Sequence, residues 1–206
     1  MGGADEALTG PTGPTGIAHC EYLKGTGNPV PFFSAMEDGN ADRPVESHGL
    51  EHKSAFLWNT RLGRKDGDLR TGVLKTIAAF ANSEGGDLVI GIGDDGSVHG
   101  IDDEVAHLFD DKHLDRYEAL LHEHAKNSLY PYPHAGYRVS LEMRGKLTVC
   151  VVKVSAVPGV TYLVGKSDSG NSVHDVYVRT GNRTIRLTDT DRDRFVVSRF
   201  GGIWPL

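Results

Sequence analysis

The sequence has only two cysteines, Cys20 and Cys150, and no apolar run that approaches the roughly 20 residues needed to cross a bilayer. Two isolated cysteines supply neither a disulfide framework nor a zinc cluster. The N-terminal segment lacks the basic start and the apolar stretch of a secretory signal. These absences favour a cytoplasmic protein with no membrane span and no zinc site.

Phosphate-binding motifs of the common nucleotide-binding folds are also missing. No GxxxxGK[ST] loop occurs in the chain. The stretch Gly91-Ile-Gly-Asp-Asp-Gly96 matches GxGxxG literally, but its two Asp side chains would stand where a pyrophosphate should lie. The following residues, Ser97 to Gly100, continue as a strand instead of opening a helix. We therefore do not interpret this pattern as a dinucleotide site.

The composition is that of one folded domain with an uneven charge. The chain has 206 residues, 38% of them hydrophobic, and a net charge of −6. Residues 136–200 contain 11 Lys/Arg and 6 Asp/Glu, whereas the remaining residues contain 11 and 22. A polyanion that faces the C-terminal part is one explanation of this asymmetry. An ordinary solvated surface is the other, and on charge alone it is the more frequent one.

Residues 1–44 differ in composition from the rest of the chain. Gly, Pro, Thr and Asn dominate as far as Pro31, and Val30-Pro-Phe-Phe33 is a short apolar exception. Such a composition buries too little apolar surface to fold alone. We expect a flexible N-terminal arm over residues 1–44 and a folded domain over residues 45–206.

A helix followed by a buried strand is predicted over residues 69–92. The spacing of the apolar residues between Leu69 and Ala81 is helical, and Asn82-Ser-Glu-Gly-Gly86 ends the helix. Leu88 to Ile92 is an aliphatic run typical of a strand covered on both faces. Gly93-Asp-Asp-Gly96 predicts a type I′ hairpin that leads into a second strand, Ser97 to Gly100.

Helices and hairpins alternate in the second half of the chain. The apolar spacing and the turn residues predict helices over 104–109, 112–128 and 188–200 and strands over 137–143, 147–154, 161–165 and 176–186, the last interrupted by a turn. Cys150 lies within a very apolar strand, which is typical of a core residue and not of a nucleophile.

Glu46, Glu51 and Lys53 combine acidic and basic side chains in a pattern that indicates metal-dependent catalysis. If residues 50–56 are a strand, Glu51 and Lys53 lie on one face. Carboxylates that hold Mg²⁺ or Mn²⁺, with a Lys that stabilises developing charge, suit phosphodiester cleavage. The alternative is a surface strand with a solvated Glu–Lys pair, which the motif alone favours.

Four motifs together resemble the Schlafen-type AlbA_2 (divergent AAA-4) domain. They are Glu46…Glu51-His-Lys53, Ala79-Phe-Ala-Asn-Ser-Glu-Gly-Gly86, Leu88-Val-Ile-Gly-Ile-Gly-Asp-Asp-Gly96…Gly100 and Tyr177-Val-Arg-Thr-Gly-Asn182, in this order over about residues 45–200. One departure is His52, where the family usually has Phe or another large apolar residue.

The resemblance implies an α+β fold with a mixed, mostly antiparallel sheet flanked by helices. It also implies a three-carboxylate endoribonuclease site like that of Schlafen proteins that cleave transfer and ribosomal RNA. That site falls on Glu46, Glu51 and Asp94, with Lys53 nearby and Mg²⁺ or Mn²⁺ as the cofactor; Asp95 competes with Asp94 for the third position. The animal nucleases pair two such lobes, so a single-lobe chain implies a homodimer.

RNA of the transfer type, or another single-stranded nucleic acid, is the partner that this resemblance implies. The candidate phosphate-binding residues are Arg179, Arg183, Arg186, Lys146 and Lys166. Arg179 and Asn82 have structural alternatives as a turn-stabilising and a helix-capping residue. The alternative function is a non-catalytic DNA- or RNA-binding module, or an ATP-binding regulatory module.

Overall fold

The computed structural model describes residues 46–110, 113–167 and 169–199, which fall in one compact unit. The flexible arm predicted over residues 1–44, which includes Cys20, lies outside the described residues. In the described part of the chain, no helix is both long and apolar enough to span a membrane.

The first of two four-stranded sheets carries the Glu-x-Lys motif on its edge strand. Its order is β1 (Leu50–Lys53), β4 (Gly86–Ile90), β7 (Leu147–Val154) and β6 (Tyr137–Arg144). β1 pairs with β4 in parallel, and the other two pairings are antiparallel. The predicted burial of the aliphatic strand on both faces is confirmed, because Leu88, Val89 and Ile90 are all buried.

The second sheet is antiparallel throughout. Its order is β10 (Arg183–Leu187), β9 (Ser172–Thr180), β8 (Tyr162–Lys166) and β5 (Leu129–Tyr130). A separate two-stranded hairpin, β2 (Trp58–Asn59) and β3 (Arg64–Lys65), lies between β1 and α1 in the chain. The predicted α+β class with mostly antiparallel pairing is therefore confirmed.

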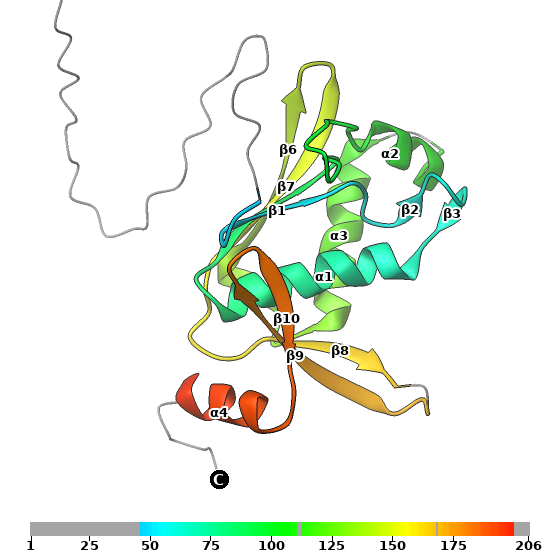
Figure 1. Cartoon of the computed structure of the whole chain (residues 1–206). Coiled ribbons are helices and arrows are strands. Elements are labelled where there is room, and N and C mark those ends of the chain that lie inside the picture. The colour runs from blue at the N-terminus through cyan, green and yellow to red at the C-terminus, as the bar shows by residue number, and fades with distance from the viewer. Residues whose placement is uncertain (1–45, 111–112, 168, 200–206) are drawn as a thin grey trace, which may run out of the picture. The chain divides into compact units, whose positions relative to one another are not determined.

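Helix α1 (Gly67–Asn82) runs between the two sheets (Figure 1) and contacts strands of both. The Asp66 side chain caps its first turn by accepting the N–H of Asp68 at 2.9 Å. A helix with a sheet on each side must be apolar on more than one face. Its buried residues accordingly include Val73, Leu74, Ile77, Ala78, Ala79, Phe80 and Ala81.

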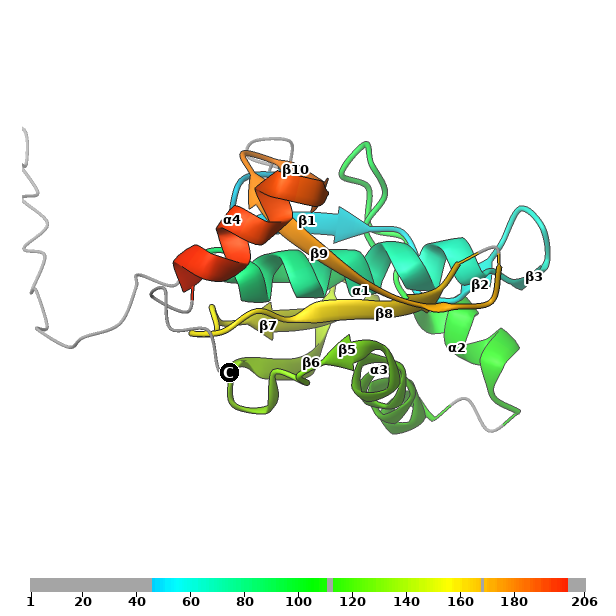
Figure 2. The same ribbon diagram turned by 90° about the horizontal axis from the view of Figure 1, so that it is seen from below.

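The other helices pack against the same core or against the second sheet. They are α2 (Asp102–Leu108), α3 (Leu114–Ser128), a short 3-10 turn η1 (His134–Gly136) and α4 (Asp189–Arg199). α4 lies against the second sheet on the face away from α1, where Val196 packs with Val160 and Val176 (Figure 2). Cys150 is buried in β7, and burial raises the pKa of its thiol to about 12, in agreement with its predicted core position.

The strand predicted over Ser97 to Gly100 is wrong, and so is the type I′ turn before it. Between β4 and α2, the backbone forms an isolated bridge from Ile92 to Val98 in place of a strand. Among the residues of this turn, only Gly96 has a positive φ, 76°, whereas a type I′ turn needs two such residues. The backbone folds back because the N–H groups of His99 and Gly100 both donate to the Gly91 carbonyl, at 2.8 and 2.9 Å.

A buried carboxylate that the sequence did not reveal organises the loop after β1. The Glu104 side chain in α2 is buried and accepts the backbone N–H of Leu57 at 2.5 Å and of Trp58 at 2.8 Å. It also accepts the N–H of Phe56 and the hydroxyl of Tyr117, at 3.1 and 2.9 Å. The acidic run 102–104 is typical of the first turn of any helix, so its pattern gave no indication of this role.

Candidate functional site

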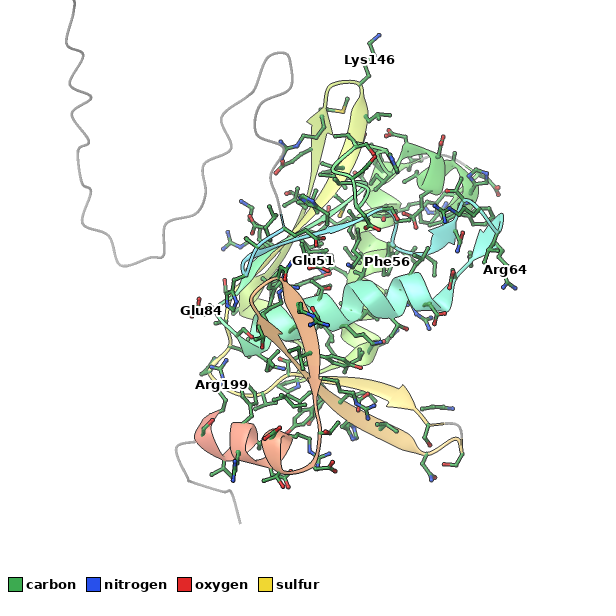
Figure 3. All side chains as sticks on the ribbon, viewed as in Figure 1. Glu51, Phe56, Arg64, Glu84, Lys146 and Arg199 are labelled. Atoms are coloured by element: carbon green, nitrogen blue, oxygen red, sulfur yellow. The ribbon has the colours of Figure 1, made fainter. Side chains whose placement is uncertain are left out.

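Glu51 and Lys53 lie on one face of β1, as the strand spacing predicted. Lys53 Nζ is 2.5 Å from Glu51 Oε1, and Arg179 Nη1 is 2.7 Å from Glu51 Oε2. Arg179 belongs to β9 of the second sheet. Both oxygens of this carboxylate therefore have a cationic partner, and the pair with Arg179 joins one sheet to the other. Figure 3 shows Glu51 close to the β9–β10 hairpin and α1.

Arg179 is committed to protein groups. Its guanidinium has no exposed surface and also donates to the Ser47 carbonyl at 2.8 Å and to Thr184 Oγ1 at 3.1 Å. It lies 5.1 Å from the centroid of the Phe80 ring, within cation–π range. These contacts give Arg179 a structural role, although a different one from the predicted stabilisation of a turn. In this arrangement the guanidinium, predicted to bind phosphate, does not reach the surface.

The Ala79–Gly86 motif forms the junction between α1 and the second sheet. The Asn82 amide accepts the N–H of Thr161 at 2.8 Å and donates to the Thr161 and Tyr177 carbonyls at 2.8 and 2.9 Å. Ser83 Oγ accepts the backbone N–H of Arg179 at 2.8 Å. Asn82 is buried, so it holds neighbouring strands in place of contacting a ligand.

Both glycines of this motif are explained by close approach. Gly85 has a φ of 86°, and a Cβ there would lie 2.6 Å from the Val154 carbonyl. A Cβ at Gly86 would lie 2.5 Å from the Phe80 ring. Side chains at either position would push β4 and β7 away from α1.

The three predicted metal ligands do not form a cation site in this arrangement. Glu46 Oε1 accepts the backbone N–H of His52 at 3.1 Å, and Asp94 is exposed in the turn after β4. Within the described ranges, no three His, Cys, Asp or Glu side chains are grouped so that they could hold a metal ion. Glu51 is already neutralised by Lys53 and Arg179. The donor set therefore does not fit Mg²⁺ or Mn²⁺ without rearrangement.

A cleft beside this pair collects residues from four elements. It has a volume of about 420 Å³ and is lined by Glu51 and Lys53 of β1, Gly72, Lys75 and Thr76 of α1, Tyr177 of β9, and Thr184 and Arg186 of β10. Three of these side chains are cationic and one is anionic. Lys75 Nζ lies 5.6 Å from the Tyr177 ring centroid, and Arg186 pairs with Asp175 at 2.8 Å.

The other predicted phosphate-binding residues are not gathered at the cleft. Arg183 is exposed at the start of β10, and Lys166 is exposed at the end of β8. Lys146 is exposed at the tip of the β6–β7 hairpin, well away from Glu51 (Figure 3). Of the five residues predicted to bind phosphate, Arg186 is the one that lines the cleft.

Lys75 and Thr184 line the cleft but were not predicted. Lys75 was missed because the helical spacing of its apolar neighbours predicts only the buried face of α1, on which Leu74 and Ile77 are core residues. Its spacing from Gly72 places both on one face of α1. Thr184 lies directly opposite Arg179 in the β9–β10 pairing. Arg179 belongs to the predicted Tyr177–Asn182 motif, so this pairing register is the signal that would have identified Thr184.

His52 occupies a core position, as the large apolar residue that the family usually has there implies. It is 4% exposed, and among the described residues its Nε2 has no hydrogen-bond partner. Burial lowers the pKa of His52 below its ordinary value of 6.5, against the opposing effect of Glu46 and Glu51. The folded protein therefore favours the neutral imidazole.

Comparisons with known proteins point to one family. The family model described as Schlafen, AlbA_2 matches residues 46–188, which leaves α4 outside the match. Among curated proteins, none matches the sequence. The crystal structure of the DIP2311 protein from Corynebacterium diphtheriae is similar at 16% identity and a TM-score of 0.42. That similarity covers 68% of this chain and 22% of that chain, so the chain corresponds to less than a quarter of that protein.

His52→Phe is expected to stabilise the fold, and to do so more at acidic pH. Folding lowers the pKa of His52, so the unfolded chain binds a proton more readily than the folded protein does. The free energy of unfolding of the wild type is therefore highest above pH 6.5 with respect to this group, and it falls as the pH is lowered. Removing an unpaired buried nitrogen should add about 1 kcal/mol. Thermal unfolding at about pH 8 and about pH 5.5 measures both effects. The explanation would be contradicted if His52→Phe gained no more stability over the wild type at about pH 5.5 than at about pH 8. An equal gain in stability in the exposed control His174→Phe would also contradict it.

Proposed function

Because the chain belongs to the Schlafen AlbA_2 family, we propose that its domain binds single-stranded or transfer-type RNA through backbone phosphate. The observation that supports this is the cleft with three cationic side chains, Lys53, Lys75 and Arg186, which come from β1, α1 and β10. Convergence of cations from separate elements suits a phosphate group, and phosphate contacts supply most sequence-independent affinity for nucleic acid.

The ion pairs around the cleft leave it positively charged. Glu51 is the anionic residue of the lining, and it is shared between Lys53 and Arg179. Asp175 offsets Arg186 in part. Lys53 uses one of its three N–H donors on Glu51 and is 31% exposed, so it has donors left for a ligand. The ammonium group of Lys75 is a compact charge on a flexible stem, which suits a point contact with phosphate.

Lys75→Ala and Arg186→Ala are expected to weaken RNA binding and its salt dependence. Each loss of a phosphate contact should lower the slope of log affinity against log salt by about 1. Fluorescence anisotropy with a labelled single-stranded RNA, over a series of salt concentrations, measures both quantities. The control is Lys146→Ala, which removes a charge far from the cleft. Equal losses in all three variants would instead indicate a diffuse electrostatic surface.

Metal-dependent cleavage of RNA, which the family resemblance implies, is the second candidate function. The observation that favours it is that Glu51 and Lys53 line the same cleft that is proposed to hold phosphate. It requires Glu51 to exchange its pairing with Arg179 for a shared site with Glu46 and Asp94. A homodimer, which would supply two lobes, stays a prediction and is measured by the mass of the protein in solution.

Cleavage is tested by incubating transfer RNA with the protein in Mn²⁺ and in chelator. If the three-carboxylate site operates, Glu51→Gln and Asp94→Asn abolish Mn²⁺-dependent cleavage and leave RNA binding largely intact. Asp94 is exposed in a turn, so Asp94→Asn should fold normally even if Glu51→Gln is destabilised. Cleavage by both variants at the wild-type rate would overturn the catalytic assignment. Binding without any metal-dependent product would identify a binding module.

A further inference from the structure

Gly72 is an unusual residue for its place in the fold. It lies within helix α1, where glycine is less favourable than alanine. Gly72, Lys75 and Thr76 have the i, i+3, i+4 spacing of one helix face, and all three line the cleft. The helix therefore carries a destabilising residue where it faces the cleft.

The usual structural reasons for glycine do not apply at this position. Unlike Gly85, Gly72 has no left-handed φ. Unlike Gly86, it faces no close neighbour, because a Cβ built on Gly72 would meet no atom within 4 Å. Neither the backbone conformation nor the packing thus requires the missing side chain. What glycine leaves behind is open space above the helix backbone, inside the cleft.

We propose that Gly72 is the specificity-determining residue of the cleft, because it keeps the helix backbone open to one nucleotide unit of a single-stranded nucleic acid. The inference rests on the proposed function, since it concerns the same cleft. A volume of about 420 Å³ is within the range of about 300–1,000 Å³ found for clefts that take one small molecule or group. Lys53, Lys75 and Arg186 hold the phosphate, and the sugar next to it lies over Gly72.

A side chain at residue 72 would occupy the space meant for that sugar. Thr76 lies beside Gly72 on the same helix face, and its Oγ1 donates to the Gly72 carbonyl at 3.2 Å. At residue 72 itself the cleft wall is bare backbone. The proposal predicts opposite effects of one substitution on folding and on binding, which a purely structural role for Gly72 would not produce.

The test compares Gly72→Ala and Gly72→Leu with the same substitutions at Gly67. Gly67 begins the same helix and does not line the cleft, and a Cβ there meets only Arg70 Nη2 at an ordinary 3.7 Å. Gly72→Ala should raise the melting temperature by about 1–4 °C and also weaken RNA binding, by less than the larger leucine does. Gly72→Leu should weaken binding of a labelled single-stranded RNA by about 10-fold or more while remaining folded by circular dichroism. Gly67→Ala and Gly67→Leu should bind as the wild type does.

Each outcome decides the proposal. Binding by Gly72→Leu at the wild-type affinity, with Lys75→Ala weakened, would overturn the role of Gly72 and leave the proposed function standing. A loss of binding in Gly67→Leu equal to that in Gly72→Leu would also overturn it. Absence of binding by the wild type would overturn the proposed function and this inference together. Should Gly72→Leu not fold, the smaller Gly72→Ala decides, since a stabilised variant with unchanged affinity also overturns the proposal.

Discussion

The buried ion pair between Glu51 and Arg179 is the interaction on which the arrangement of the site depends. It joins β1 of one sheet to β9 of the other across the C-terminal end of α1. Charges that are taken out of water are stabilising only when both partners are present, and removing one costs about 3–5 kcal/mol. The same arginine holds the turn before β1 through the Ser47 carbonyl. The predicted catalytic strand is therefore positioned by a residue from the far end of the domain.

This pairing also sets the charge of the cleft. With Glu51 neutralised, Lys53, Lys75 and Arg186 dominate the lining. Positive charge of this kind would attract phosphate without a metal ion, which is why we propose binding ahead of cleavage. Cleavage would require the carboxylate to leave Arg179, at the expense of the contact between the sheets. The two candidate functions thus make competing demands on one side chain.

The sequence predicted the local elements well because their signals are local. The apolar period of α1, the alternation of β6 and the apolar run of β7 are properties of short windows. Contacts between distant residues were not accessible in this way: Glu51 and Arg179 are 128 positions apart, and nothing in either motif indicates the other as its partner. Ser97 to Gly100 was predicted wrongly because its composition suits a strand, whereas its N–H groups bond back to Gly91.

The most direct test of this account is a double-mutant cycle on the ion pair, with Glu51→Gln, Arg179→Met and the double variant compared by urea unfolding. If the pair joins the sheets, each single substitution is strongly destabilising. The double variant should then lose at least about 1 kcal/mol less than the two single losses added together. Losses that add within about 0.5 kcal/mol would show that the two side chains act independently, and would contradict the account.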